Sequence, residues 1–168
     1  LIHLHDILRS IIFPDAVTNQ QRFRLTEEDY RFLYQCMSQY PEESTDPIYD
    51  PEQYYQAYTR FLLFGGEKDS LIPAHIRIFN KPGWAYGFLT DTAYIVDFAN
   101  NTEFLLSASI FVNTSGILGD DQKAFEETGK PFLKALGEIV YAAEVERNKK
   151  VLPDLSRFKS NKKNTTDQ

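Results

Sequence analysis

The residues able to do chemistry in this sequence are few: three histidines, one cysteine and a Lys-Pro-Gly tripeptide at 81–83. His3 and His5 are two positions apart in an expected helix, where such residues do not face each other, so no metal site is expected there. His75 directly precedes an expected strand and is interpreted as the residue that leads into it, not as a catalytic base. The sequence therefore indicates no metal and no cofactor.

The two matches to the S-x-x-K nucleophile motif lie in the polar C-terminal segment, at Ser156–Lys159 and Ser160–Lys163. The motif works where a buried helix start holds the lysine amine against the serine hydroxyl in a dry cleft. A polar segment after Pro153 provides neither burial nor a helix. The chain also contains no G-x-S-x-G, H-E-x-x-H, Walker or G-x-G-x-x-G motif. No nucleophile is therefore expected within these residues.

Three consecutive antiparallel strands are predicted in the middle of the chain, and the first turn is expected to carry Lys81-Pro82-Gly83. Ile76–Asn80 alternates apolar and polar residues, as a half-buried strand does. The second strand is expected at about 86–98, and Asn100-Asn101 then supplies turn chemistry because Asn tolerates positive φ. Glu103–Val112 is almost continuously apolar, which is typical of a strand covered on both faces and not of an edge strand.

Three helices are predicted before this meander. Apolar residues spaced three and four apart define the first at 1–12, and Pro14 ends it. Thr26 caps the second, and Pro41 lies just beyond it. Its apolar residues are Phe32, Leu33, Cys36 and Met37. The third is expected to start at Asp50, its cap, and to stop at Gly65-Gly66.

A final long helix is predicted from about 123 or 131 to 148. One apolar stripe marks it: Phe132, Leu133, Leu136, Ile139, Val140 and Ala143. Helices, then an antiparallel three-strand meander, then one long helix predict an α+β fold. Residues 1–152 are expected to form the domain, and residues 153–168 a polar, disordered tail.

Composition excludes several partners. A net charge of −6 leaves no basic face for nucleic acid. No apolar run approaches the about 20 residues that span a bilayer. Cys36 is the single cysteine, so no internal disulfide is possible. The chain begins at Leu1 and not at a methionine, so it is interpreted as cut at this end, and the lack of a targeting segment carries no information.

The residues around the tripeptide resemble a known family. Lys81-Pro82-Gly83 is followed by Tyr86-Gly87, Asp91, Ala93 and Ile95. This run is similar to the K-T-G strand and its sequel of Y-G, D and A-x-I in the class A β-lactamases and related penicillin-binding proteins. It resembles most the β-lactamase-related serine hydrolases of Bacteroidetes type. Over about residues 1–158, the expected order of elements resembles the C-terminal portion of that fold.

The resemblance implies roles for four residues. Lys81 matches the family lysine whose positive charge favours a substrate carboxylate and an ionised nucleophile. Gly83 would let substrate approach the strand backbone closely. Trp84 follows the motif, where the backbone N–H helps to form the oxyanion hole. Pro82 stands where the family has Thr or Ser and offers no hydroxyl to the substrate.

The resemblance also implies what lies outside these residues. The family nucleophile sits in an upstream S-x-x-K, and a second motif, S-x-N or Y-x-N, has no match here. The chain is therefore interpreted as the C-terminal portion of a serine hydrolase that acts by acyl transfer on a small-molecule or peptide substrate. Its expected partner is the missing N-terminal part of the same domain, which would pair with the outer edge of the Glu103–Val112 strand. A periplasmic or extracytoplasmic bacterial location is implied.

Two alternatives remain open. One is a non-catalytic relative with the same fold, in which the cleft at Pro82 binds a peptide or cell-wall fragment without turnover. The other is an unrelated α+β interaction domain whose aromatic residues, 14% of the chain, line a groove. An upstream S-x-x-K in the parent gene would separate the first interpretation from both alternatives.

Overall fold

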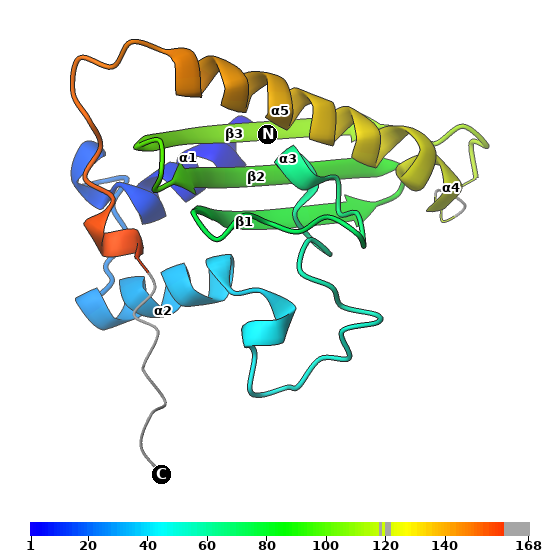
Figure 1. Cartoon of the computed structure of the whole chain (residues 1–168), viewed down its shortest axis with the longest axis horizontal. Coiled ribbons are helices and arrows are strands. Elements are labelled where there is room, and N and C mark those ends of the chain that lie inside the picture. The colour runs from blue at the N-terminus through cyan, green and yellow to red at the C-terminus, as the bar shows by residue number, and fades with distance from the viewer. Residues whose placement is uncertain (118, 120–121, 160–168) are drawn as a thin grey trace.

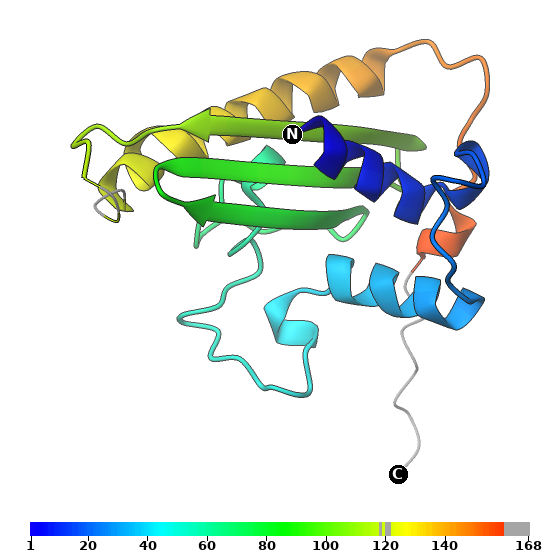
Figure 2. The same cartoon turned by 180° about the vertical axis from the view of Figure 1, so that it is seen from behind.

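The computed structural model describes residues 1–117, 119 and 122–159. Strands β1 (Ile76–Ala85), β2 (Phe88–Asp97) and β3 (Thr102–Phe111) form one antiparallel sheet in the order β1-β2-β3. Helix α5 (Lys130–Glu146) crosses one face of this sheet and helix α1 (Ile2–Ile12) crosses the other, as Figures 1 and 2 show from opposite sides. The predicted α+β fold, a three-strand meander flanked by helices, is therefore confirmed.

Helix α2 (Glu27–Ser38) packs along β1 (Figure 1). Thr26 is its N-cap, as predicted, and forms a capping box with Asp29. The remaining elements are short: η1 (Pro14–Ala16), η2 (Pro41–Glu43), α3 (Phe61–Phe64), α4 (Gln122–Ala124), the π-helical turn η3 (Phe125–Gly129) and η4 (Ser156–Phe158). No helix among the described residues has the length and apolar character to cross a membrane.

The strand covered on both faces is β2, whereas the sequence analysis gave this place to the third strand. Leu89 and Ile95 of β2 are buried against α3 and α5, and Tyr94 and Val96 are buried against α1 and η4. β3 lies at the edge of the sheet, and no strand in the described part of the chain pairs with its outer side. Its apolar run is therefore only partly covered.

The third predicted helix is wrong. Residues 51–60 form successive turns, and α3 is distorted within a single turn because Leu63 has a φ of 79°. Two contacts impose this path. The N–H groups of Phe61 and Leu62 donate to the buried Asp91 carboxylate, and Gly137 of α5 lies directly against the Leu63 backbone. Tertiary contacts thus override the local helix signal, although Gly65 does end the segment in the left-handed conformation, as expected.

Burial along the helices also differs from the predicted stripes. Phe32 and Cys36 are exposed on α2, which instead buries Tyr30 and Ser38. On α5 the apolar stripe is only partly buried. Within the stripe only Leu133 is fully buried, while Phe132 and Ile139 keep 46% and 68% of their surface exposed. Gly137, which the stripe did not include, is buried as well.

The C-terminal segment packs against the domain beyond residue 152, where a disordered tail was expected to begin. Leu155 and Phe158 are buried against Phe79 and Tyr94, and Arg157 donates a 2.6 Å hydrogen bond to the Ile12 carbonyl. The boundary expected after residue 152 is therefore misplaced for residues 153–159. The rest of the expected tail, 160–168, lies outside the described residues.

Candidate functional site

The Lys81-Pro82-Gly83 tripeptide lies within β1 and not in the turn where the sequence analysis placed it. The turn is Tyr86-Gly87, and both residues have positive φ, 52° and 82°, as a two-residue type I′ hairpin requires. A Cβ at Gly87 would also lie 2.6 Å from Asn113 Cβ, so glycine is needed there. The strand therefore continues past the tripeptide and holds it in an extended conformation.

The hairpin register decides which way the backbone of the tripeptide points. Ala85 closes the two-residue turn and exchanges backbone hydrogen bonds with its partner on β2, as do alternate residues back along β1. Pro82 and Trp84 are the intervening residues, so their backbone groups point away from the sheet. The same outward direction is seen at Ile76, whose carbonyl accepts a 3.2 Å hydrogen bond from the Tyr40 hydroxyl. Pro82 fits this outer edge because no ladder bond is required of it, and the Trp84 N–H points outward there.

Side chains of the tripeptide alternate between the two faces of the sheet. Lys81 and Gly83 lie on the α1 face and are exposed, while Pro82 and Trp84 lie on the α5 face. Lys81 Nζ donates a 3.0 Å hydrogen bond to the Pro82 carbonyl and has no ion-pair partner among the described residues. A Cβ built on Gly83 meets no atom within 4 Å, so the surface above this residue is open.

Hydroxyl groups continue from Lys81 and Gly83 across the α1 face of the sheet. The register places four of them in two cross-strand rows: Thr92 and Ser107 beside Lys81, and Thr90 and Ser109 beside Gly83. The sequence analysis missed these residues. The signal that could have found them is the spacing Thr-x-Thr and Ser-x-Ser within two strands, which puts each pair on one face.

Two of these hydroxyls are paired across the sheet, and one has no partner. Thr90 Oγ1 and Ser109 Oγ are 2.6 Å apart, and His5 Nδ1 lies 2.9 Å from Ser107 Oγ. Thr92 Oγ1 is buried without a hydrogen-bond partner. His5 thus contacts the sheet, so the H-x-H pair does not act as a unit.

A buried polar network supports the tripeptide strand from the α5 face. Asn80 Nδ2 donates to Asp91 Oδ1 at 2.9 Å and to the Thr59 carbonyl at 2.7 Å. Asp91 Oδ2 accepts the N–H groups of Phe61 and Leu62 at 3.2 and 3.1 Å. Arg60 donates to Asn80 Oδ1 and, at 2.8 Å, to the Gln39 carbonyl. The network joins β1 and β2 to the segment before α3.

Burial shifts the pKa values of both charged residues of this network, Asp91 and Arg60. The Asp91 side chain is fully enclosed, and this burial raises the pKa of Asp91 to about 6, although the hydrogen bonds from Asn80 and the Leu62 N–H and the charge of Arg60 oppose the change. Burial likewise lowers the pKa of Arg60 to about 10. Since both groups are held by backbone and amide partners deep in the domain, we assign them a structural role.

The resemblance motif therefore divides into two parts. Tyr86-Gly87 forms the hairpin turn, and Asp91, Ala93 and Ile95 are buried on one face of β2, so the fold accounts for all of them. Lys81 and Gly83 contribute their backbones to the hairpin, but the Lys81 ammonium bonds only to the Pro82 carbonyl and the surface above Gly83 is open. The fold therefore does not account for the types of side chain at these two positions.

A second polar group lies at the other end of β1, beside a pocket of about 520 Å³ between α5 and residues 63–76. The Asp97 carboxylate is fully covered and accepts a 2.6 Å hydrogen bond from the Tyr141 hydroxyl. Burial raises the pKa of Asp97, but this bond and those from Asn100 and the Ala99 N–H outweigh it, so the pKa lies below its usual range.

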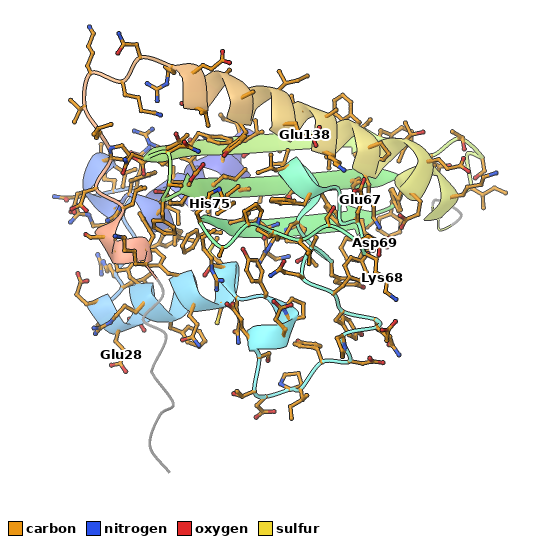
Figure 3. All side chains as sticks on the ribbon, viewed as in Figure 1. Glu28, Glu67, Lys68, Asp69, His75 and Glu138 are labelled. Atoms are coloured by element: carbon orange, nitrogen blue, oxygen red, sulfur yellow. The ribbon has the colours of Figure 1, made fainter. Side chains whose placement is uncertain are left out.

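His75 and Glu138 line the same pocket (Figure 3), and Glu67 pairs with Lys134 there at 2.6 Å. The closest approach of His75 to Asp97 is 4.0 Å, from Nε2 to Oδ1, which is too long for a hydrogen bond. Its backbone carbonyl instead accepts the Phe98 N–H at 2.8 Å. His75 therefore leads into β1 and has no nucleophile paired with it in the described part of the chain.

No group of three or more metal-ligating side chains occurs among the described residues. No family model, no curated protein and no solved structure matched the chain.

Proposed function

We propose that this chain forms the strand wall of an acyl-transfer site of the β-lactamase and penicillin-binding type. The hydroxyl oxygen of a serine outside these residues attacks the carbonyl carbon of the substrate. The bond between this carbon and the leaving group then breaks, which leaves an acyl-serine. Negative charge develops on the carbonyl oxygen during the attack. The outward Trp84 N–H and the Lys81 ammonium stabilise this charge.

One observation carries the proposal: Lys81 and Gly83 are exposed on the same face of β1, two positions apart, and the Lys81 side chain bonds only to the Pro82 carbonyl. A lysine without an ion-pair partner can bind the carboxylate of a substrate. The open surface above Gly83 lets a flat acyl group reach the strand backbone. Both features lie at the end of β1 where the Trp84 N–H points outward.

The test is to extend the reading frame upstream and to treat the longer protein with a fluorescent penicillin or a fluorophosphonate probe. Covalent labelling is expected and is lost when the serine of an upstream S-x-x-K is changed to alanine. A folded longer protein that neither probe labels would overturn the acyl-transfer proposal.

Pro82 supports a second candidate, a non-catalytic binding module for a peptide or cell-wall fragment. The side chain at this position has no hydroxyl to hold a substrate carboxylate, so the cleft is poorly suited to turnover. Saturable binding of such a fragment without labelling by either probe would favour this function.

A further inference from the structure

The only tryptophan of the chain forms one wall of a small pocket on the α5 face of the sheet. This pocket is separate from the Lys81 surface because Trp84 and Lys81 project from opposite faces of β1. Its volume is about 210 Å³. Its walls are Tyr55, Tyr58, Phe61, Trp84, Leu89, Phe125, Glu126 and Lys130.

The aromatic walls meet nearly at right angles. The Tyr58 and Trp84 rings are 6.2 Å apart with an interplanar angle of 82°, and Phe61 and Trp84 are 5.4 Å apart at 66°. Tyr55 meets Tyr58 at 83°. Five aromatic side chains thus line the pocket, and the face of an aromatic ring can contact a flat apolar surface.

The residues that line the pocket also carry hydrogen-bonding groups. The Tyr58 hydroxyl and the Trp84 indole N–H make no hydrogen bond to any described residue. Lys130 Nζ contacts Glu126 Oε1 at 2.6 Å, which leaves further ammonium donors on Lys130. The Tyr55 hydroxyl is already engaged, because it donates a 2.6 Å bond to the Gly66 carbonyl. The pocket thus offers both aromatic faces and unsatisfied donors to one ligand.

Charge and size restrict what this ligand can be. Glu126 and Lys130 form an ion pair, so together they give the pocket no net charge that would attract an ionic ligand. The volume is below the roughly 300 Å³ at which pockets for drug-sized molecules begin, so it suits a single ring. A sugar ring has an apolar C–H face and a rim of hydroxyls, which matches these walls.

We propose that the Trp84 pocket binds a neutral, monosaccharide-sized sugar ring. The C–H face of the ring stacks on an aromatic wall, and its hydroxyls bond to Tyr58, to Lys130 and to the Trp84 indole N–H. The acyl-transfer proposal uses the backbone N–H of Trp84, whereas this site uses its side chain, which lies on the face of β1 opposite Lys81. The pocket needs no nucleophile and is present in the chain as it stands.

The test uses the emission of Trp84, which reports on this pocket alone because no other tryptophan exists. The probes are methyl β-glucopyranoside and methyl N-acetyl-β-glucosaminide, titrated into the 168-residue chain. At least one is expected to change the emission saturably, in the millimolar range that suits so small a ligand. Tetramethylammonium and p-cresol, titrated in parallel, test a cation and a plain aromatic ring.

Two variants and one control locate the binding. Tyr58→Leu and Lys130→Met are each expected to weaken sugar binding at least about 10-fold, the loss of one good hydrogen bond or ring contact. Tyr54→Leu is the matched control, because Tyr54 belongs to the same aromatic row but does not line the pocket. Near-ultraviolet circular dichroism checks that each variant is folded.

Three results would overturn the proposal. The first is the absence of any saturable response to either sugar in the folded wild-type chain. The second is sugar binding that both pocket variants leave unchanged. The third is tighter binding of tetramethylammonium or p-cresol than of either sugar, which would make the pocket a cation cage or an aromatic subsite.

Discussion

Asn80 on β1 donates a 2.9 Å hydrogen bond to Asp91 on β2, on the covered face of the sheet directly behind the tripeptide strand. The two residues are diagonal neighbours across the hairpin, and Asp91 also holds the first two backbone N–H groups of α3. The exposed Lys81 and Gly83 are therefore mounted on a hairpin whose position is fixed from behind. The buried Asn80–Asp91 pair and the exposed Lys81 and Gly83 can therefore be tested by separate substitutions.

Asp91→Asn is expected to destabilise the protein. The amide has one oxygen in place of two, so it cannot accept from Asn80 and from the Phe61 and Leu62 N–H groups together. Leaving buried donors unsatisfied costs roughly 1–3 kcal/mol, which urea denaturation would measure. Asp69→Asn is the matched control, because Asp69 is exposed, and it is expected to change stability by less than about 0.5 kcal/mol. Equal stability of the two variants would contradict the role given to Asp91.

The pH dependence of stability should carry the signature of Asp91. Its folded pKa, about 6, lies above the ordinary value of 3.8, so the folded chain holds this proton more tightly than the unfolded chain. The stabilising contribution of Asp91 is therefore complete below that ordinary value and is lost as the pH rises through about 6. Asp97 and Glu43, whose pKa values are lowered, act in the opposite sense.

Subtracting the unfolding free energy of Asp91→Asn from that of the wild type at each pH isolates this term. The difference is expected to fall as the pH rises from acidic to neutral values. A difference that stays flat or rises over this range would show that folding does not raise the pKa of Asp91.

The elements that sequence patterns predicted well are those whose signals are local. The capping residue Thr26, the spacing of the first helix and the Asn100-Asn101 turn all depend on neighbouring residues, and the structure confirms them. The failures arise from distant partners. Residues 51–60 form turns in place of the predicted helix, and the residues that follow, Phe61–Leu63, are held by Asp91 and Gly137, which lie far away in the chain.

At the candidate site too, the sequence predicted the residue types but not the features that depend on distant partners. The types of Lys81 and Gly83 suggested chemistry, but their exposure, the outward direction of the Trp84 N–H and the opposite projection of its indole follow from the hairpin register. The position of the turn sets that register, and the turn was predicted a few residues too early. Because the turn lies at Tyr86-Gly87, the whole tripeptide belongs to β1.

Two glycines provide a paired test of packing and function. A Cβ at Gly137 would lie 2.2 Å from the Leu63 N atom, so Gly137→Ala must displace α5 from the α3 backbone and is expected to cost roughly 1–3 kcal/mol. Gly83→Ala meets open space and should leave the melting temperature nearly unchanged. Under the proposed function, Gly83→Ala is nevertheless expected to slow probe labelling of the longer protein, because the methyl group covers the strand backbone. A stable Gly137→Ala variant would contradict the close helix packing.

Lys81→Ala tests whether the Lys81 ammonium acts in the proposed reaction without contributing to stability. The ammonium bonds only to the neighbouring Pro82 carbonyl, so its removal should change the free energy of unfolding by less than about 0.5 kcal/mol. Under the proposed function, the rate of probe labelling of the longer protein should fall about 100-fold, the usual effect of removing one electrostatic donor. Lys68→Ala, at an exposed lysine paired with Glu52, serves as the control and should label at the wild-type rate. Unchanged labelling of Lys81→Ala would remove Lys81 from the proposed site.

The outer edge of β3 predicts self-association of the 168-residue chain. Alternate residues of β3, Ser109 among them, direct their backbone N–H groups away from β2, and no described strand accepts them. Phe111 and Phe88 lie exposed beside this edge and contact each other at 4.9 Å between ring centroids. An unpaired edge of this kind is a template for pairing with a second chain.

Light scattering of the purified chain is therefore expected to show dimers or larger species whose fraction grows with concentration. Ser109→Lys places a charge on the edge and should shift the distribution toward monomer, since charged residues block edge pairing. Ser115→Lys adds the same charge on the exposed loop after β3 and should leave the distribution as in the wild type. A wild-type chain that is monomeric at all concentrations and melts cooperatively would show that the β3 edge is protected without a partner.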